Sequence, residues 1–254
     1  MFYRYTKAGL RVPMDLDNIF SGSCFIAGGS PVLLEENLSI LDQPGISVVA
    51  INNTSAIVPA TVAVFGDKPL CYSDRILRDP KIMKFGVISR RDYEVAGKPW
   101  KHQPNTFFFG TSDDFTVGDL LKPDRDLAWW KNTFFMALQL ACRLGFNKAY
   151  LIGCQFKIGG TRHYAYDMSL DQNQLDWNTK TYNRAVDNMK FLKPHFDKVG
   201  FEVISSTPDS PLNEIYPFVP MRDAVQEILK DYPREYNTAA CLHSSSLGEN
   251  NPTL

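Results

Sequence analysis

Short apolar runs that end at glycine or small polar residues recur along this chain, and they predict a series of buried strands. Ser23–Ala27 is the first such run, and Gly28-Gly29-Ser30-Pro31 follows it at once. Apolar runs of this length, bounded by turn residues, are typical of strands in a parallel sheet. The other predicted strands are Ser47–Ile51, Thr61–Phe65, Phe85–Ser89, Thr106–Gly110, a run ending at Ile152, and Phe201–Ser206.

The stretch from Asn132 to Phe156 shows how strands and helices alternate. A polar Asn132-Thr133 entrance leads into apolar residues at helical spacing, and a second apolar run closes on Gly153. This order predicts a helix, a glycine turn, a buried strand and a loop. Two further helices are predicted: Thr179–Val199, with Ala185, Met189, Leu192 and Phe196 on its apolar face, and a helix over about Pro220–Tyr232.

This alternation predicts an α/β fold with a doubly wound, mostly parallel, Rossmann-like sheet and a small lid region. Residues 1–22 are mixed in composition and are expected to form an irregular lead-in. Residues 23–235 are expected to form a single α/β nucleotide-binding transferase domain, in which the loop Thr111–Asp126 closes over the site. Residues 236–254 are rich in Ser, Asn and Gly and are expected to be a flexible tail.

Composition narrows the class of protein. The 254 residues are 44% hydrophobic, enough for one large core, and 27 basic against 28 acidic residues give no global field that would steer the chain toward nucleic acid or anionic lipid. The five cysteines include no CxxC pair, so neither disulfides nor a zinc site is expected. No run reaches the roughly 20 apolar residues of a membrane span. We therefore expect a protein of the reducing cytoplasm, with no metal.

The turn after the first strand is a candidate phosphate site. Ligands of doubly wound sheets bind beyond the carboxyl ends of the strands. Gly28 and Gly29 let the backbone approach a ligand closely, Ser30 can donate or cap, and Pro31 suits a first helical position. The alternative is a tight turn with nothing bound.

The next two strands end in further hydrogen-bonding residues. Asn52 and Asn53 follow the second strand, and Asp67 follows the third. Three such strand ends suit a nucleotide, whose base, ribose and phosphates need separate partners. Ordinary turn residues are the alternative for the asparagine pair.

The loop after Ile152 is the best catalytic candidate. Lys157 and Arg162 could neutralise a departing phosphate, Tyr164 could hydrogen-bond it, and His163 could take or give a proton near neutral pH. Taken alone, His163 could equally be a surface histidine.

The order of these motifs resembles that of the small bacterial lipooligosaccharide sialyltransferases. More distantly, it resembles the superfamily of motility accessory factor glycosyltransferases and hydroxymethylpterin diphosphokinase-like proteins. The motifs that carry the resemblance are Ala27–Leu33, Asn52 or Asn53, Ala63–Asp67, Asn132–Phe134, Leu144–Phe146, Tyr150–Phe156, His163–Asp167 and Thr207–Leu212.

The resemblance covers roughly residues 23–215 and implies a metal-independent transferase of a GT-A-like sialyltransferase type, which uses a CMP-activated acidic sugar and no cofactor. It implies that the first turns, Gln155 and Ser210 bind the nucleotide or donor, that Asn132 and Thr133 contact the donor, and that Tyr164 helps the phosphate depart.

The chain also departs from the family's pattern. Gly29 replaces an asparagine, Lys157 replaces a tyrosine, Gln155 replaces an aspartate, and no histidine lies near Lys180, where the family has its catalytic histidine. His163 or Asp167 would then have to act as the base.

Two other functions stay open at this stage. One is Mg²⁺-dependent diphosphoryl or phosphoryl transfer to a small heterocycle, with Asp67 and Asp167 as metal ligands. The other is a nucleotide-binding protein without catalysis. The partners expected for a transferase are a nucleotide-sugar donor and an acceptor that the sequence does not identify; a nucleic-acid acceptor and a homo-oligomer are both compatible with the sequence.

Overall fold

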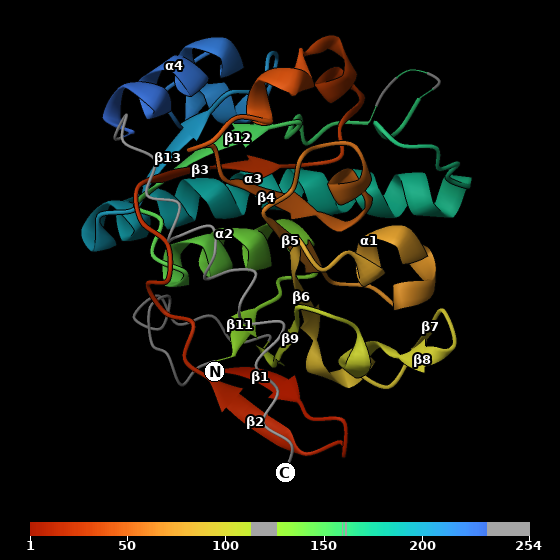
Figure 1. The fold of residues 1–254 in the computed structure, drawn as a ribbon. Helices are drawn as coiled ribbons and strands as arrows, with labels where there is room; N and C mark the ends of the chain where they lie inside the picture. The colour runs from red at the N-terminus through yellow and green to blue at the C-terminus, as the bar shows by residue number, and fades with distance from the viewer. Residues whose placement is uncertain (113–125, 159, 161, 233–254) are drawn as a thin grey trace.

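The computed structural model describes residues 1–112, 126–158, 160 and 162–232. Its centre is a nine-stranded sheet in the order β13-β12-β3-β4-β5-β6-β9-β1-β2. The strands from β13 to β9 run parallel, and β1 and β2 continue the sheet as an antiparallel pair (Figure 1). The predicted mostly parallel α/β sheet is therefore confirmed.

The bounds of the elements are as follows. The sheet strands are β1 Phe2–Tyr5, β2 Arg11–Met14, β3 Ser23–Ala27, β4 Val48–Ile51, β5 Val62–Phe65, β6 Met83–Val87, β9 Thr106–Phe109, β12 Lys148–Ile152 and β13 Glu202–Ser205. Two small pairs are β7 Glu94–Val95 with β8 Lys98–Pro99, and β10 Thr111–Ser112 with β11 Leu127–Ala128. The α-helices are α1 Asp74–Arg78, α2 Thr133–Arg143, α3 Gln172–Val199 and α4 Met221–Asp231. The 3-10 helices are Pro31–Glu35, Leu38–Leu41, Asn52–Ala56, Pro69–Cys71, Ile88–Arg90, Trp100–His102 and Pro211–Glu214.

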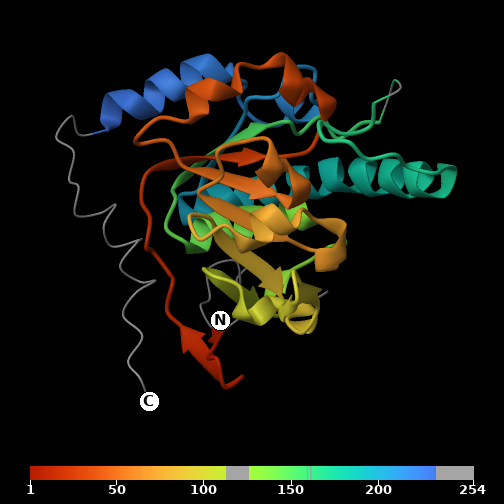
Figure 2. The same cartoon turned by 45° about the vertical axis from the view of Figure 1, so that its right-hand side comes forward.

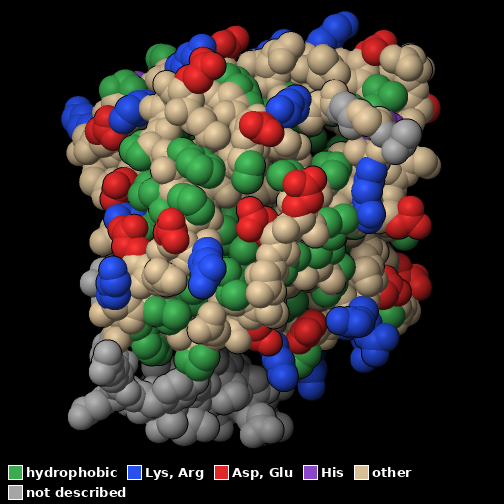
Figure 3. Space-filling model, turned by 90° about the horizontal axis from the view of Figure 1, so that it is seen from above, with side chains coloured by type: hydrophobic (Ala, Val, Ile, Leu, Met, Phe, Trp, Pro, Cys, Tyr) green, Lys and Arg blue, Asp and Glu red, His purple; other side chains and the backbone are tan. Residues whose placement is uncertain are grey.

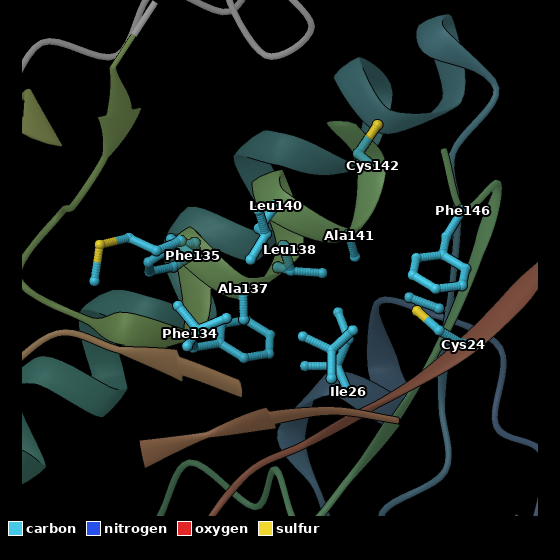
Figure 4. Close-up of a cluster of buried hydrophobic side chains, with 14 of the residues drawn as sticks. Cys24, Ile26, Phe134, Phe135, Ala137, Leu138, Leu140, Ala141, Cys142 and Phe146 are labelled. Atoms are coloured by element: carbon cyan, nitrogen blue, oxygen red, sulfur yellow. The ribbon is translucent and has the colours of Figure 1, made fainter. Parts of the chain in front are cut away.

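Alternation along β3 divides the core into two layers. Cys24 and Ile26 pack with α2 and α3 on one face of the sheet, whereas Phe25 and Ala27 pack with α4 on the other. Because side chains alternate between the faces of a strand, a strand that is covered on both faces is apolar throughout. Figure 4 shows the α2 side of this core, with Ile26 directed toward the apolar side chains of α2.

The chain changes direction within the sheet next to β3. Strands β4, β5, β6 and β9 are added in sequence on one side of β3; the chain then returns through α2 to place β12, and later β13, on the other side. At such a switch point, the loops that follow two neighbouring strands run in opposite directions, and a crevice forms between them. The turn after β3 and the loop after β12 are these two loops.

The structure corrects three expectations. Residues 1–22 are not wholly irregular, because β1 and β2 extend the sheet beyond β9. Strand β6 spans Met83–Val87, two residues earlier than expected, since its register follows from pairing with β5 and β9. Helix α3 begins at Gln172 rather than Thr179, because Asp171 and Gln174 form a reciprocal capping box.

The predicted lid stays a prediction. Residues 113–125 of the loop Thr111–Asp126 lie outside the described residues, as does the predicted tail at 236–254. Within the described chain, no helix is long and apolar enough to cross a membrane. On the face in Figure 3, acidic and basic side chains are interspersed, so that this face presents no field of a single sign.

Replacing Asp171 with alanine should fray the start of α3. The Asp171 carboxylate accepts the Gln174 N–H at 2.8 Å, and the loss of such a cap costs about 1 kcal/mol. Ahead of Asn178, which donates to the Tyr164 hydroxyl, the helix has no buried side chain, so little packing would hold the uncapped first turns. We expect faster amide hydrogen exchange over residues 172–177, with no such change in the exposed-site control Lys180→Ala. Equal exchange in both variants would contradict this role.

Candidate functional site

A cavity of about 780 Å³ lies at the carboxyl ends of β3, β4, β5 and β12, where the switch point predicts a ligand site. Its lining combines the turn after β3, the loop after β12, the start of α2 and the first half of α3. The residues that were predicted from sequence and line it are Gly28, Gly29, Ser30, Asn52, Asp67, Asn132, Thr133, Gln155, Lys157, His163 and Tyr164.

Two glycines allow the loops on either side of the switch point to meet. A Cβ on Gly28 would lie 2.5 Å from the Gly153 carbonyl oxygen, and a Cβ on Gly153 would lie 2.6 Å from the Gly28 carbonyl oxygen. Gly153 also has a φ of 61°, which disfavours other residues. Because no side chain fits at either position, the two loops meet backbone to backbone, and both glycines line the cavity.

A side-chain hydrogen bond joins the same two loops. The Ser30 hydroxyl donates to Gln155 Oε1 at 2.6 Å, and the Ser30 N–H donates to the Gly153 carbonyl at 3.0 Å. Ser30 precedes the 3-10 helix Pro31–Glu35, but its side chain does not cap that helix. The hydroxyl therefore fixes the distance between the turn after β3 and the loop after β12.

Asn52 connects the ends of three elements. Its Oδ1 accepts hydrogen bonds from the Gly66 N–H at 3.3 Å and from the Tyr72 hydroxyl at 3.0 Å, and its Nδ2 lies 3.5 Å from Thr133 Oγ1. It has a φ of 52°, a left-handed conformation that asparagine tolerates better than most residues. The strand ends of β4 and β5 and the start of α2 are thus held together at the cavity wall.

The N-terminus of α2 supplies positive electrostatic potential. Asn132 caps the helix by accepting the Phe134 N–H at 3.0 Å, and Thr133 is the first helical residue. Lys131 also lines the cavity, and it is the second of two consecutive residues with positive φ, at 43° for Trp130 and 56° for Lys131. A helix N-terminus beside a lysine favours an anion.

Tyrosines from the loop after β12 and from α3 also line the cavity. The rings of Tyr164 and Tyr166 stack with centroids 5.0 Å apart, and the Asn178 amide donates to the Tyr164 hydroxyl at 2.9 Å. Burial raises the pKa of Tyr166, with a further contribution from Tyr164 and Asp67. Burial likewise raises the pKa of Tyr182, and Tyr164 adds to the shift. The two phenols with raised pKa values are therefore neutral hydrogen-bonding groups at neutral pH.

Five predicted residues do not line the cavity. Pro31 begins a 3-10 helix, Asp167 is exposed, and the Asn53 amide donates to the Cys71 carbonyl. The Ser210 hydroxyl is buried and donates to the Cys154 carbonyl at 2.8 Å, and Arg162 donates to the carbonyls of Tyr164 and Ala165. Arg162 and Ser210 thus hold the loop after β12 rather than face the cavity.

Sequence reasoning missed the contribution of α3. Its cavity-lining side chains lie in Asn173–Tyr182, mostly ahead of the apolar periodicity from which the helix was predicted. Asp171 followed three residues later by Gln174 is a capping-box pattern, and it could have revealed the earlier start. Tyr166 and Lys131 were also missed; no pattern in the sequence separates them from other loop residues.

The ionisable groups of the lining limit its chemistry. Burial raises the pKa of Cys154 to about 12, so that this thiol is protonated and is not a nucleophile at neutral pH. Lys131, Lys157 and His163 are the basic side chains of the lining. Among the described residues, no group of three or more His, Cys, Asp or Glu side chains is placed to hold a metal ion.

No family model matches the sequence, and no curated protein matches it. Among solved structures, the chain is similar to the MAf glycosyltransferase from Magnetospirillum magneticum AMB-1, with a TM-score of 0.50 and 10% identity over 88% of this chain. The match spans only 36% of that protein's length. A second similar structure is monomeric CstII, with a TM-score of 0.44 and 14% identity, covering 83% of this chain and 100% of CstII.

At 10% identity, the first likeness shows a shared fold. It supports the glycosyltransferase part of the resemblance at the level of the fold. Neither structure supports the part that concerns hydroxymethylpterin diphosphokinase-like proteins.

Proposed function

We propose that this chain is a glycosyltransferase that moves a sugar from a nucleotide-activated donor, with a CMP-sugar favoured, to an acceptor hydroxyl. The observation that carries the proposal is the cavity at the switch point. On one side it is lined by the glycines after β3, by Asn52 and by the N-terminus of α2. The loop after β12 adds tyrosine, histidine and lysine side chains to the same cavity. The shared fold with a glycosyltransferase adds support.

The donor would occupy the side of the cavity formed by the strand ends. Gly28, Gly29 and Ser30 would accommodate the phosphate, with Asn52 and Asp67 beside the nucleoside. The N-terminus of α2 at Thr133, with Lys131, would accept the negative charge of the donor, because both favour an anion.

The transfer step would take place against the loop after β12. The acceptor oxygen attacks the anomeric carbon as the bond from that carbon to the phosphate oxygen breaks, and the leaving nucleotide keeps the electron pair. His163 would take the proton of the acceptor hydroxyl, while Lys157 and Tyr164 would stabilise the charge on the departing phosphate. Arg162, which donates to two loop carbonyls, would position Tyr164.

A thermal-shift panel of CMP, CDP, UDP, GDP, GTP and ATP, each with and without Mg²⁺, tests this proposal. A ligand that binds only the folded state adds about 2.7 kcal/mol of stability at a concentration 100 times its Kd. We expect CMP or CDP to raise the melting temperature without metal. Stabilisation by ATP or GTP only with Mg²⁺ would favour phosphoryl transfer instead, and no shift with any nucleotide would reject the nucleotide site.

A further inference from the structure

The first half of α3 presents an uncharged face to the cavity. Its cavity-lining residues form two rows at i, i+4 spacing, which places the members of a row next to one another on the helix surface. All six side chains can hydrogen-bond, and none carries a formal charge at neutral pH. One row is Asn173, Trp177 and Thr181, and the other is Gln174, Asn178 and Tyr182.

Packing accounts for Tyr182 at the inner end of this face, which contacts Phe156, but not for the residues from Asn173 to Asn178. The first buried residue of α3 is Ala185, and the Trp177 side chain is 56% exposed. Figures 1 and 2 show this half of the helix extending beyond the sheet, with the loop after β12 alongside it. The Trp177 residue lines the cavity and is about half exposed, so that its indole is accessible to a ligand.

The chemistry of the face fits a carbohydrate. Amide groups both donate and accept, as sugar hydroxyls do, and an indole ring offers an apolar surface to the C–H face of a pyranose. A nucleic-acid strand would need cations along its phosphates, but the six residues of the face include none. The charged residues of this half, Asp176, Lys180 and Arg184, do not line the cavity; the charged N-cap residue Asp171, just before the helix, does.

The face also contacts the loop after β12, where the transfer step is proposed to take place. The Asn178 amide donates to the Tyr164 hydroxyl at 2.9 Å, and the Tyr182 ring packs edge-on against Phe156 with centroids 5.9 Å apart. A sugar ring over Trp177 would therefore lie beside the loop that carries Tyr164 and His163.

We infer that the first half of α3 is the acceptor subsite and that the acceptor is an uncharged carbohydrate whose ring stacks on Trp177. This inference rests on the proposed glycosyltransferase function, since it assigns the second substrate of the same site.

Saturation-transfer NMR with a fixed set of methyl glycosides tests the subsite directly. The probes are methyl glycosides of galactose, glucose, mannose and N-acetylglucosamine, and methyl lactoside. The matched control for Trp177→Ala is Phe191→Ala, because Phe191 is 54% exposed on the same helix and does not line the cavity. We expect at least one glycoside to bind the wild type and the control, and to bind Trp177→Ala at least about tenfold more weakly.

Four results would overturn the inference. Two concern the glycosides: no binding of any glycoside to the wild type, or equal binding to both variants. The third is Trp177-dependent binding of a single-stranded oligonucleotide in place of the glycosides. The fourth is a Trp177-dependent dimer in size-exclusion chromatography, which would assign the face to a second copy of the chain. The CMP-induced thermal shift should be the same in all three proteins; its absence alongside Trp177-dependent glycoside binding would reject the nucleotide donor while leaving the carbohydrate subsite.

Discussion

Replacing Tyr164 with phenylalanine should lower the turnover of a CMP-sugar about 100-fold, the loss typical of removing one hydrogen bond that stabilises a developing negative charge. The hydroxyl lies in the cavity, where it accepts a hydrogen bond from the Asn178 amide at 2.9 Å, so that its own proton can be directed to the departing phosphate. The ring would still stack on Tyr166, and the loop would keep its shape.

The measurement is the rate of CMP release from CMP-N-acetylneuraminate, with CMP binding followed in parallel by thermal shift. The matched control is Tyr216→Phe, which removes a buried hydroxyl that donates to the Met189 carbonyl far along α3. We expect the control to keep its turnover and Tyr164→Phe to keep its CMP-induced shift. Equal turnover in wild type and Tyr164→Phe would show that the Tyr164 hydroxyl takes no part in the reaction.

Replacing Gly28 with alanine should destabilise the fold and disrupt the cavity together. The added Cβ would lie 2.5 Å from the Gly153 carbonyl oxygen and 2.9 Å from Cys154 Sγ. Because the nearest atom belongs to backbone, the turn after β3 and the loop after β12 would have to separate. Overpacking of this kind costs about 1–3 kcal/mol.

The neighbouring Gly29 provides the control. A Cβ there would lie 3.0 Å from Tyr166 Cε1 and 3.3 Å from Tyr164 Cδ1, both on side chains that can shift. In urea unfolding we expect Gly28→Ala to lose clearly more stability than Gly29→Ala, and to lose its CMP-induced shift. Equal losses of stability in both variants would show that the close approach of Gly28 to Gly153 does not decide how well the turn tolerates a side chain.

The strands were predictable because each is apolar on both faces and ends at a turn residue. Strands β3, β4, β5, β9 and β13 all lie within one residue of their predicted ends. In contrast, β1 and β2 were missed. Strand β2 is the edge strand of the sheet and consists of exposed or half-buried residues, so it carries no apolar run. Strand β1 lies between β2 and β9, and its pairing with β9 connects residues far apart in sequence.

The part of the site that lies at the strand ends, with Gly28, Asn52 and Asp67, could also be predicted. The reason is that the carboxyl ends of parallel strands meet at one edge of the sheet. Sequence could not show which side chain of a pair faces inward. Asn52 lines the cavity while Asn53 bonds to the Cys71 carbonyl, and Arg162 turns to loop carbonyls while His163 lines the cavity. The α3 half was missed because a polar face carries no hydrophobic periodicity.

The Asn52 and Asn53 pair gives the most direct test of the nucleotide site. We would titrate CMP into wild type, Asn52→Gly and Asn53→Gly by calorimetry; glycine keeps the left-handed conformation that Asn52 adopts. We predict metal-independent binding of CMP to the wild type, at least about tenfold weaker binding to Asn52→Gly, and nearly unchanged binding to Asn53→Gly. No binding of CMP to the wild type, or equal affinity in all three proteins, would contradict the proposed site.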